Sequence, residues 1–227
     1  MISGFSKLTI AAPDLDKATS DYSLLLGEFS SAAATPCLPL SNIGIELCTG
    51  AKQTEAAISE LTLWRDSSVP GGPALPQDCR GLALQLSQQR EVSSGGILTS
   101  TGILGVDHIV LQTRDADDCI RLFGESGLGM RLALDQSVPE WGGRMLFFRC
   151  GKLTLEVIHN QEQPPERDSL WGLTFLCPDL ELTLATLDAN GVEHSGLRAG
   201  RKPGTRVATV KSHDLGIPTL LLEPASR

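Results

Sequence analysis

Two glutamates at the ends of similar segments are the first candidates for chemistry in this chain. Glu156 ends the run Leu-Thr-Leu-Glu, and Glu223 ends the run Leu-Leu-Leu-Glu. Each segment opens with a strand that leads into a helix begun by an aspartate, and each closes on the strand that carries the glutamate. A repeat of this length indicates two copies of one small module. We therefore expect the acidic residues of the two copies to face a shared cleft.

A basic segment supplies the second group of candidates. Residues 198–206 hold Arg198, Arg201, Lys202 and Arg206 and no acid, in a chain whose formal net charge is −8. Glycine and proline favour a loop here, and guanidinium groups can clamp a carboxylate or a phosphate with two parallel hydrogen bonds. The alternative is a solvated loop whose arginines pair with surface acids. We interpret the segment as a contact for an anionic ligand.

Trp141 is the third candidate, because two glycines follow it in a loop between two expected strands. An aromatic ring beside flexible residues could form a lid or the wall of a pocket. The alternative is a tryptophan that packs over the edge of a barrel. We group Trp141 with the four basic residues as candidate ligand-binding residues.

The elements that position these residues follow the same order in both modules. In each, a strand leads to an aspartate that suits a helix N-cap, Asp115 in the first module and Asp179 in the second. Three strands follow each helix. Those of the first module are expected over 130–134, 144–149 and 152–159, and those of the second over 192–195, 206–211 and 217–223.

The N-terminal part resembles weaker copies of the same module. A strand over 7–11, a helix begun by Asp14 and a strand over 43–47 suggest a third copy. Residues 81–86 are similar to the opening strand of a fourth copy, which lacks a helix.

These patterns predict that the chain is divided into three parts. Residues 1–92 form a degenerate pair of modules, and the linker covers 93–104. Residues 105–227 form a domain of two modules, at 105–160 and 168–224.

Composition narrows the class of protein. Hydrophobic residues make up 41% of the 227 residues, enough for a sizeable core. The negative charge argues against nucleic-acid binding, which needs a basic face. The longest apolar runs are too short to cross a membrane, and the N-terminus lacks the pattern of a secretory signal. The six cysteines form no CxxC motif, so we expect reduced thiols in a cytoplasmic protein.

The run Asp107-His108-Ile109-Val110-Leu111, followed by Asp115, is similar to the opening strand of the vicinal oxygen chelate superfamily. The strands that end at Glu156 and Glu223 resemble the fourth strand of that superfamily, which includes glyoxalase I, extradiol dioxygenases, epimerases and bleomycin- or fosfomycin-resistance proteins. The resemblance covers 105–224 well and 5–90 loosely.

The resemblance implies an α+β fold in which repeated βαβββ modules pair into half-open barrels around a metal or ligand cleft. Two full C-terminal modules and a degenerate N-terminal half would make up the chain. Members of the superfamily commonly form homodimers, and a homodimer is the expected assembly here.

The resemblance also implies a metal site. The superfamily places ligands on the opening strand and on the fourth strand of both modules, which correspond here to His108, Glu156, Gly172 and Glu223. Since Gly172 has no side chain, His108, Glu156 and Glu223 are the expected ligands. One imidazole and two carboxylates suit a divalent ion such as Mn, Fe, Ni, Zn or Mg. Glu156 or Glu223 could then act as the general base, while the metal stabilises an oxyanion.

The alternative to this metal site is a histidine that lines a cleft without a metal, with glutamates paired to nearby arginines. In the weaker N-terminal copy the corresponding residues are Lys7, Gly81 and Glu46, which do not form a plausible metal set.

Three functions follow from these expectations. The first is a glyoxalase-type, metal-dependent lyase or isomerase that acts on a small oxygenated, anionic compound. The second is a metal-free small-molecule binding or resistance-type protein of the same fold. The third and least favoured is an extradiol dioxygenase, because those relatives typically use two histidines and one glutamate, and Gly172 stands at the place of the second histidine.

Overall fold

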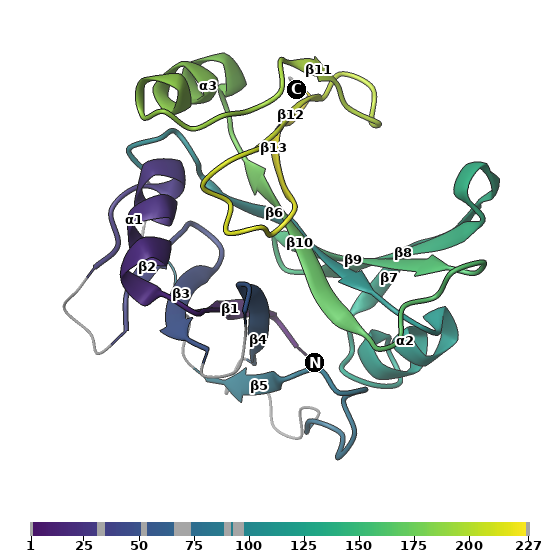
Figure 1. The fold of residues 1–227 in the computed structure, drawn as a ribbon. Helices are drawn as coiled ribbons and strands as arrows, with labels where there is room; N and C mark the ends of the chain where they lie inside the picture. Colours follow the sequence, from purple (N-terminus) through teal and green to yellow (C-terminus); the bar gives the residue numbers. More distant parts are fainter. Residues whose placement is uncertain are drawn as a thin grey trace.

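Two β-sheets and three α-helices make up the described part of the chain (Figure 1). The structure is a computed structural model, and it describes residues 2–30, 35–50, 54–65, 74–88, 92 and 98–225, except for the side chain of Trp141. No helix among these residues is long and apolar enough to span a membrane.

The C-terminal half forms a sheet of eight strands, in the order β11-β12-β13-β10-β6-β9-β8-β7. Its first module contains β6 (Gly105–Gln112), α2 (Ala116–Phe123), β7 (Arg131–Val138), β8 (Gly143–Cys150) and β9 (Leu153–Asn160). Its second module contains β10 (Ser169–Leu176), α3 (Leu180–Ala189), β11 (Arg198–Ala199), β12 (Arg206–Thr209) and β13 (Thr219–Glu223). Each module is thus a βαβββ unit, as the sequence predicts.

The two modules join through their opening strands. Strands β6 and β10 run antiparallel, and the register pairs His108 with Thr174. The closing strand of each module runs parallel to its opening strand, β9 beside β6 and β13 beside β10. The α+β fold with paired βαβββ modules is therefore confirmed.

The helices begin where the sequence places their caps. The Asp115 carboxylate accepts hydrogen bonds from the backbone N–H groups of Asp117 and Asp118. Asp179 caps α3 in the same way, through the N–H of Leu182. These carboxylates satisfy N–H groups that have no partner within the helix and lie at the positive end of the helix dipole.

The second module differs from the expectation around its short strands. Residues 192–195 contribute an isolated bridge between His194 and Val210 in place of a strand. The basic segment 198–206 is a hairpin rather than a plain loop, because β11 pairs with the start of β12. A turn over 200–205 connects these two strands, and Thr205 Oγ1 donates a hydrogen bond to the carbonyl of Lys202 at 2.6 Å.

The N-terminal half forms a five-stranded sheet in the order β2-β3-β1-β4-β5. Its elements are β1 (Gly4–Ala12), α1 (Leu15–Leu26), β2 (Cys37–Pro39), β3 (Gly44–Thr49), β4 (Ala57–Trp64) and β5 (Leu84–Ser87). Strand β4 runs antiparallel to β1, as β10 does to β6, and β5 runs parallel to β4, as β13 does to β10.

One detail of the expected N-terminal half is corrected by this topology. The opening strand of the fourth copy is β4, and the second half of the run 81–86 belongs to β5, which takes the place of a closing strand. A short run of alternating leucines fits either role, because an opening and a closing strand in such a unit both pack against the core.

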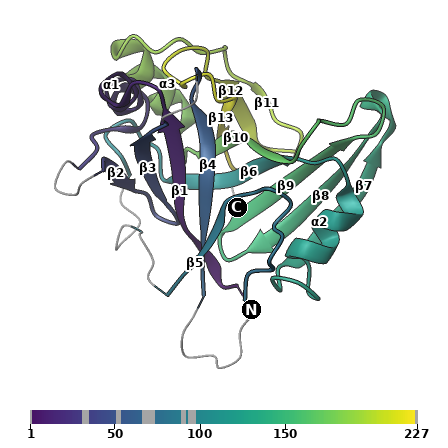
Figure 2. The same cartoon turned by 60° about the horizontal axis from the view of Figure 1, so that its bottom comes forward.

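Both halves share one hydrophobic core. Tyr22 and Leu8 of the N-terminal half belong to the same buried cluster as Phe175 and Leu187 of the C-terminal half. Helices α1 and α3 lie near each other in both views (Figures 1 and 2), and the Asn190 amide donates a hydrogen bond to the carbonyl of Leu24 at 2.9 Å. All six cysteines are free, and Cys119, Cys150 and Cys177 are buried.

The linker predicted over 93–104 lies partly outside the described residues, since 93–97 are not described. Its remainder packs firmly against both halves. Ile103 is fully buried, and the N–H of Leu104 donates to the carbonyl of Leu176 at 2.9 Å.

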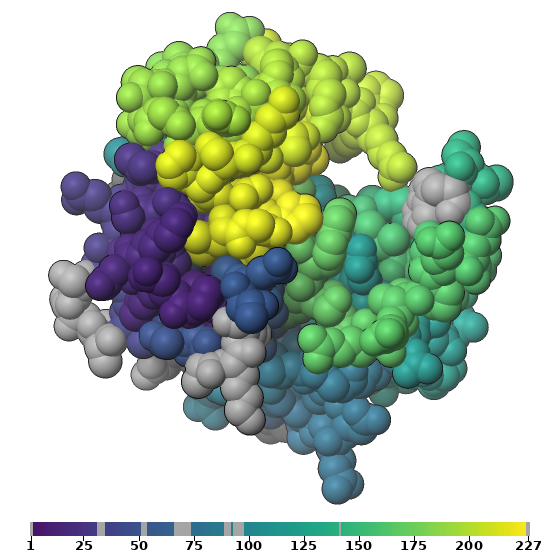
Figure 3. All heavy atoms as spheres, in the orientation of Figure 1, coloured from purple at the N-terminus to yellow at the C-terminus, as the bar shows by residue number. Residues whose placement is uncertain are grey.

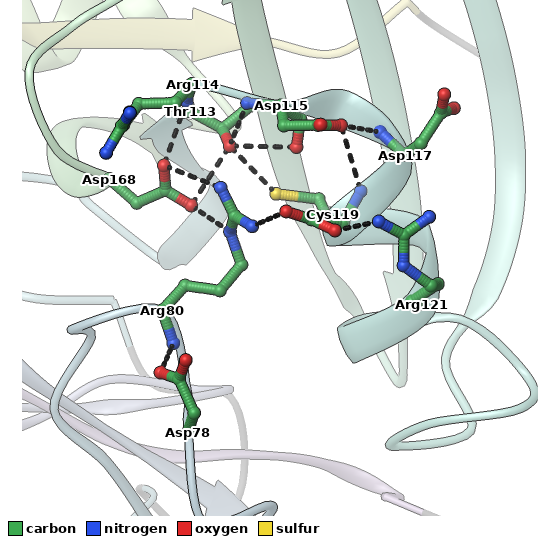
Figure 4. Close-up of polar contacts among 10 residues, drawn as sticks. Asp78, Arg80, Thr113, Arg114, Asp115, Asp117, Cys119, Arg121 and Asp168 are labelled. Atoms are coloured by element: carbon green, nitrogen blue, oxygen red, sulfur yellow. Dashed lines mark hydrogen bonds and ion pairs between the residues drawn. The ribbon is translucent and has the colours of Figure 1, made fainter.

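An arginine from the N-terminal half enters a polar network of the C-terminal half (Figure 4). Both oxygens of the Asp168 carboxylate accept hydrogen bonds from Arg80, and Asp118 is a second ion-pair partner of this guanidinium. Asp168 also accepts from Thr113 Oγ1 at 3.0 Å and from the N–H of Arg114 at 2.9 Å. Since the Asp168 side chain is 1% exposed, its charge depends on these donors.

Replacing Arg80 is expected to destabilise the fold. Arg80→Met would leave the Asp168 carboxylate buried without its counter-charge, at a cost of about 3 kcal/mol in the free energy of unfolding. Arg121→Met is the matched control, because Arg121 is an exposed partner of Asp118 and its loss should cost under about 0.5 kcal/mol. Urea denaturation measures both values, and equal losses in the two variants would contradict the assigned role of Arg80.

Candidate functional site

A cleft of about 760 Å³ lies between the two modules of the C-terminal half. Strands β6, β8 and β9 line one side, and the hairpin of β11 and β12 with β13 lines the other. In the space-filling view the surface is hollowed between the yellow-green C-terminal residues and the green strands of the first module (Figure 3). Its volume is in the range of small-molecule sites.

His108 lies on the floor of this cleft and has a polar partner at each ring nitrogen. Its Nδ1 is 2.9 Å from Asp107 Oδ2, and its Nε2 is 2.8 Å from Thr174 Oγ1. The same Nε2 is 3.2 Å from Glu156 Oε2. These contacts fix the plane of the imidazole ring. The His108 hydrogen bond and charge hold the pKa of Asp107 below its usual range.

Glu156 faces the same cleft because of strand alternation on β9, where Thr154 and Glu156 point to one face. Its side chain is 13% exposed. Burial raises the pKa of Glu156 above its usual value, while the charges of His108 and Arg201 act in the opposite direction. The structure therefore brings two of the three expected metal ligands together.

Glu223 is not brought to the other two. Its carboxylate accepts two hydrogen bonds from Arg206, at 3.0 Å and 2.7 Å, and one from the N–H of Leu180 at 2.8 Å. The Arg206 guanidinium holds the pKa of Glu223 below its usual range, and the Leu180 N–H acts in the same direction. Strand alternation is the reason, since Leu220 and Leu222 take the cleft-facing positions on β13.

Gly172 lies on β10 at the position that corresponds to His108 on β6, because each of them pairs with the residue two positions further along the partner strand. The cross-strand neighbour of His108 is Thr174, whereas Gly172 pairs with Val110. A Cβ atom at Gly172 would lie 2.8 Å from the backbone oxygen of Pro218, closer than real Cβ contacts allow. A side chain at this position would therefore displace the neighbouring backbone.

The side chains present do not fit the metal site that the superfamily implies. His108 and Glu156 converge, but leucines fill the facing positions on β13. Within the described residues, no group of three or more His, Cys, Asp or Glu side chains is placed to hold a metal ion. Two protein ligands are fewer than the three typical of catalytic zinc sites and the four typical of structural ones.

Three of the four basic candidates line the cleft, namely Arg198, Arg201 and Lys202. Arg206 instead pairs with Glu223 and with Glu181, on the side of α3. The Arg201 guanidinium reaches across the cleft, because its Nη1 lies 3.2 Å from the sulfur of Met145 on β8. The Trp141 backbone ends a single 3₁₀ turn over Pro139–Trp141, and its side chain lies outside the described residues.

Sequence reasoning missed one cationic residue of the cleft, Arg149. Residues Met145, Phe147 and Arg149 alternate along β8 and all line the cleft. The intervening Phe148 faces the other way and packs against Phe123 of α2, with ring centroids 5.9 Å apart. The alternation of these side chains with a period of two residues along β8 is the feature of the sequence that could have identified Arg149 as a cleft residue. Asp107 was also missed as a cleft residue, although it precedes His108 directly.

The four cations of the cleft share one property. Among the described residues, no carboxylate forms an ion pair with any of these four cations, which are Arg149, Arg198, Arg201 and Lys202. Ion pairs with carboxylates are formed by other arginines, namely Arg80, Arg121, Arg144 and Arg206. All four cleft cations are exposed. The cleft therefore has positive charge available for a ligand.

The N-terminal half holds an ion pair at the positions that correspond to His108 and Glu156. Strands β1 and β3 pair Thr9 with Glu46, as β6 and β9 pair Val110 with Glu156. Two residues before Thr9, Lys7 corresponds to His108. Its ammonium nitrogen lies 3.0 Å from Glu46 Oε1, so a side-chain cation already neutralises this carboxylate.

Comparison with known proteins places the C-terminal half in a family. Residues 107–209 match the Glyoxalase/Bleomycin resistance protein/Dioxygenase superfamily. This match and the paired βαβββ modules confirm the resemblance to the vicinal oxygen chelate superfamily that the sequence indicates. No curated protein sequence matches the chain significantly.

Solved structures extend the likeness of the fold to both halves. A mutant of 4-hydroxymandelate synthase from Streptomyces coelicolor is similar over 100% of this chain and 94% of its own, with 13% identity and a TM-score of 0.71. Methylmalonyl-CoA epimerase from Mycobacterium tuberculosis covers 57% of this chain and 94% of its own, with 20% identity and a TM-score of 0.48. The epimerase from Streptomyces coelicolor has 18% identity, covers 55% and 99%, and has a TM-score of 0.44. At these identities the likeness concerns the fold alone.

The raised pKa of Glu156 predicts a pH-dependent effect of its replacement. Below the ordinary glutamate pKa of about 4.3 the carboxyl is neutral in both the folded and the unfolded chain, so it contributes no pH dependence there. Above that value the unfolded chain releases the proton first, so the stability contributed by this group falls as pH rises through the folded pKa.

Glu156→Gln removes the ionisable carboxyl group, and with it the loss of stability that its ionisation causes as pH rises. The stability of the variant relative to the unchanged protein should therefore rise with pH above the ordinary glutamate pKa of about 4.3. Thermal melts across this range measure it, with Glu162→Gln, an exposed glutamate, as the control. A difference that stays constant or falls with pH would contradict the raised pKa.

Proposed function

We propose that the chain binds a small organic anion in the cleft of its C-terminal half, without a metal ion held by three protein ligands. The observation that carries this proposal is the group of four cations, Arg149, Arg198, Arg201 and Lys202, that line the cleft without a carboxylate partner among the described residues. A cluster of cations in a cleft raises the local concentration of anions, and this cluster stands out in a chain whose net charge is −8.

Arg201 is the central residue of this proposal. Its contact with Met145 is made to a thioether, a weak acceptor, and the guanidinium forms no ion pair with a carboxylate among the described residues. Arg198 donates a hydrogen bond to the hydroxyl of Thr209, which is also neutral. A carboxylate or phosphate in the cleft would be a stronger acceptor for both groups, with the bidentate geometry that guanidinium groups favour.

Replacing Arg201 is expected to weaken the binding of anions. Arg201→Gln should raise the Kd of a bound carboxylate about tenfold or more, because it removes a charge-assisted hydrogen bond. Calorimetric titration with mono- and dicarboxylates and with inorganic phosphate measures the effect. Arg131→Gln, on the exposed edge strand β7, is the matched control and should leave Kd unchanged. Saturable binding that is insensitive to Arg201→Gln, or no saturable binding at all, would refute the proposal.

A glyoxalase-type, metal-dependent lyase or isomerase is the second candidate. It is favoured by the convergence of His108 Nε2 and Glu156 Oε2 at 3.2 Å on the floor of the cleft. In such an enzyme Glu156 would be the candidate base, and Glu223 would not, because Arg206 and the start of α3 hold its carboxylate on the other face of β13. Small oxygenated anions are the expected substrates of this candidate as well.

Elemental analysis distinguishes the two candidates. Protein purified without chelator should contain well under one Mn, Fe, Ni or Zn ion per chain and should take up none at stoichiometric level when the ion is added, because two ligands hold a metal weakly. One ion per chain, lost in His108→Ala and retained in His159→Ala, would favour the metal-dependent enzyme. His159 lies on the same strand as Glu156 and does not line the cleft.

Three expectations from the sequence stay predictions. These are the division into parts at residues 92 and 105, a homodimer as the assembly, and a cytoplasmic location. Light scattering at several protein concentrations tests the assembly directly. A mass of twice the 24.2 kDa of the chain would support the homodimer.

A further inference from the structure

The cleft contains more than charged groups, because both of its walls carry apolar side chains. On β8, Met145 and Phe147 line the cleft, and on the opposite wall Val207, Leu220 and Leu222 do the same. Phe147, Leu220 and Leu222 are only half-buried, so apolar surface remains open to water at this place. A ligand that covers this surface gains the free energy of apolar burial.

The strand registers place these walls on either side of a polar floor. Phe147 pairs with Glu156 across β8 and β9, and His108 pairs with Thr174 across β6 and β10. Thr174 in turn pairs with Leu220 on β13, and Leu222 pairs with Val207 on β12. Phe147 and Glu156 lie in the same row as Val110 and Gly172, and His108 and Thr174 lie with Leu220 in the neighbouring row, so the polar floor lies between Phe147 on one side and Leu220 on the other.

The cationic residues of the cleft are more exposed to solvent than its apolar residues. Arg149, Arg198, Arg201 and Lys202 are exposed, whereas Phe147, Leu220 and Leu222 are half-buried. Cations and apolar surface adjoin each other, because Arg201 Nη1 lies 3.2 Å from the sulfur of Met145 on the apolar wall. A ligand that matches both has an acidic group at one end and an apolar body beside it.

We infer that the ligand is an amphiphilic organic acid, whose acidic group contacts the exposed cations and whose apolar body lies between Phe147 and the leucines Leu220 and Leu222. This inference rests on the proposed function and adds the chemical class of the ligand. The leucines are central to it. Leu220 stands on β13 at the position that Glu156 has on β9, because Leu220 pairs with Thr174 on β10 as Glu156 pairs with Val110 on β6. The second module therefore contributes an apolar contact where the first contributes a polar one.

A series of straight-chain carboxylates tests the inference. Acetate, butyrate, hexanoate and octanoate differ only in their apolar length, and alcohols of the same lengths lack the charge. Each buried CH₂ should lower Kd about fourfold, until the walls are covered. The alcohols should bind at least tenfold more weakly than the acids of equal length, because they lack a charge-assisted contact with the cations. Calorimetric titration measures all Kd values on the full chain.

Two leucine variants complete the experiment. Leu222→Gln should flatten the dependence of Kd on chain length while acetate binding changes little, and Leu182→Gln is the matched control because Leu182 is 61% exposed on α3. Leu220→Gln provides a second test of the same wall if the first variant fails to fold.

The outcomes separate the two proposals. Acids whose Kd does not depend on chain length would overturn the amphiphilic class and leave anion binding standing. Alcohols that bind as tightly as acids of equal length would overturn the amphiphilic class and also weaken the case for anion binding. No saturable binding by any acid would overturn the proposed function and the inference together. Length dependence that survives both Leu222→Gln and Leu220→Gln would also overturn the inference, because the apolar body would then lie elsewhere.

Discussion

The antiparallel pairing of β6 with β10 is the contact on which the cleft depends. It joins the two C-terminal modules by their opening strands and sets His108 beside Thr174. Because each closing strand lies parallel to its opening strand, this register also decides which residues of β9 and β13 face one another across the cleft. A shift of one residue would turn every side chain of one module to the opposite face of the sheet. The polar floor and both walls therefore share one structural origin.

Strand alternation explains why the two glutamates differ so strongly. Glu156 points into the cleft, where burial raises its pKa and His108 is its nearest partner. Glu223 points toward α3, where Arg206 and the first N–H of the helix stabilise its ionised form. One carboxylate is thus available to a ligand, and the other supports the second module. The same division separates Arg201, which lines the cleft, from Arg206, which neutralises Glu223.

The N-terminal half supports the domain that carries the cleft. Its strands repeat the pairing of the C-terminal half in shortened form, and the Lys7–Glu46 ion pair occupies the positions that correspond to His108 and Glu156. The shared core and the Arg80–Asp168 contact hold the two halves against each other. Because Asp168 also receives hydrogen bonds from Thr113 and Arg114, Arg80 stabilises the segment that leads into α2.

The sequence by itself determined the order of the elements in the first C-terminal module, the helix caps at Asp115 and Asp179, and the resemblance to a known superfamily. These properties are local, because they depend on the spacing of hydrophobic residues along the sequence, on the capping residues and on the repeated strand endings. It also identified His108, Glu156 and Arg201, which the structure places in one cleft. Only the tertiary structure decided the direction of Glu223, the pairing of Thr174 with His108, and the role of β4 as an opening strand. These properties depend on sheet register and on partners distant in the sequence, and a one-residue difference in register reverses the face that a side chain occupies.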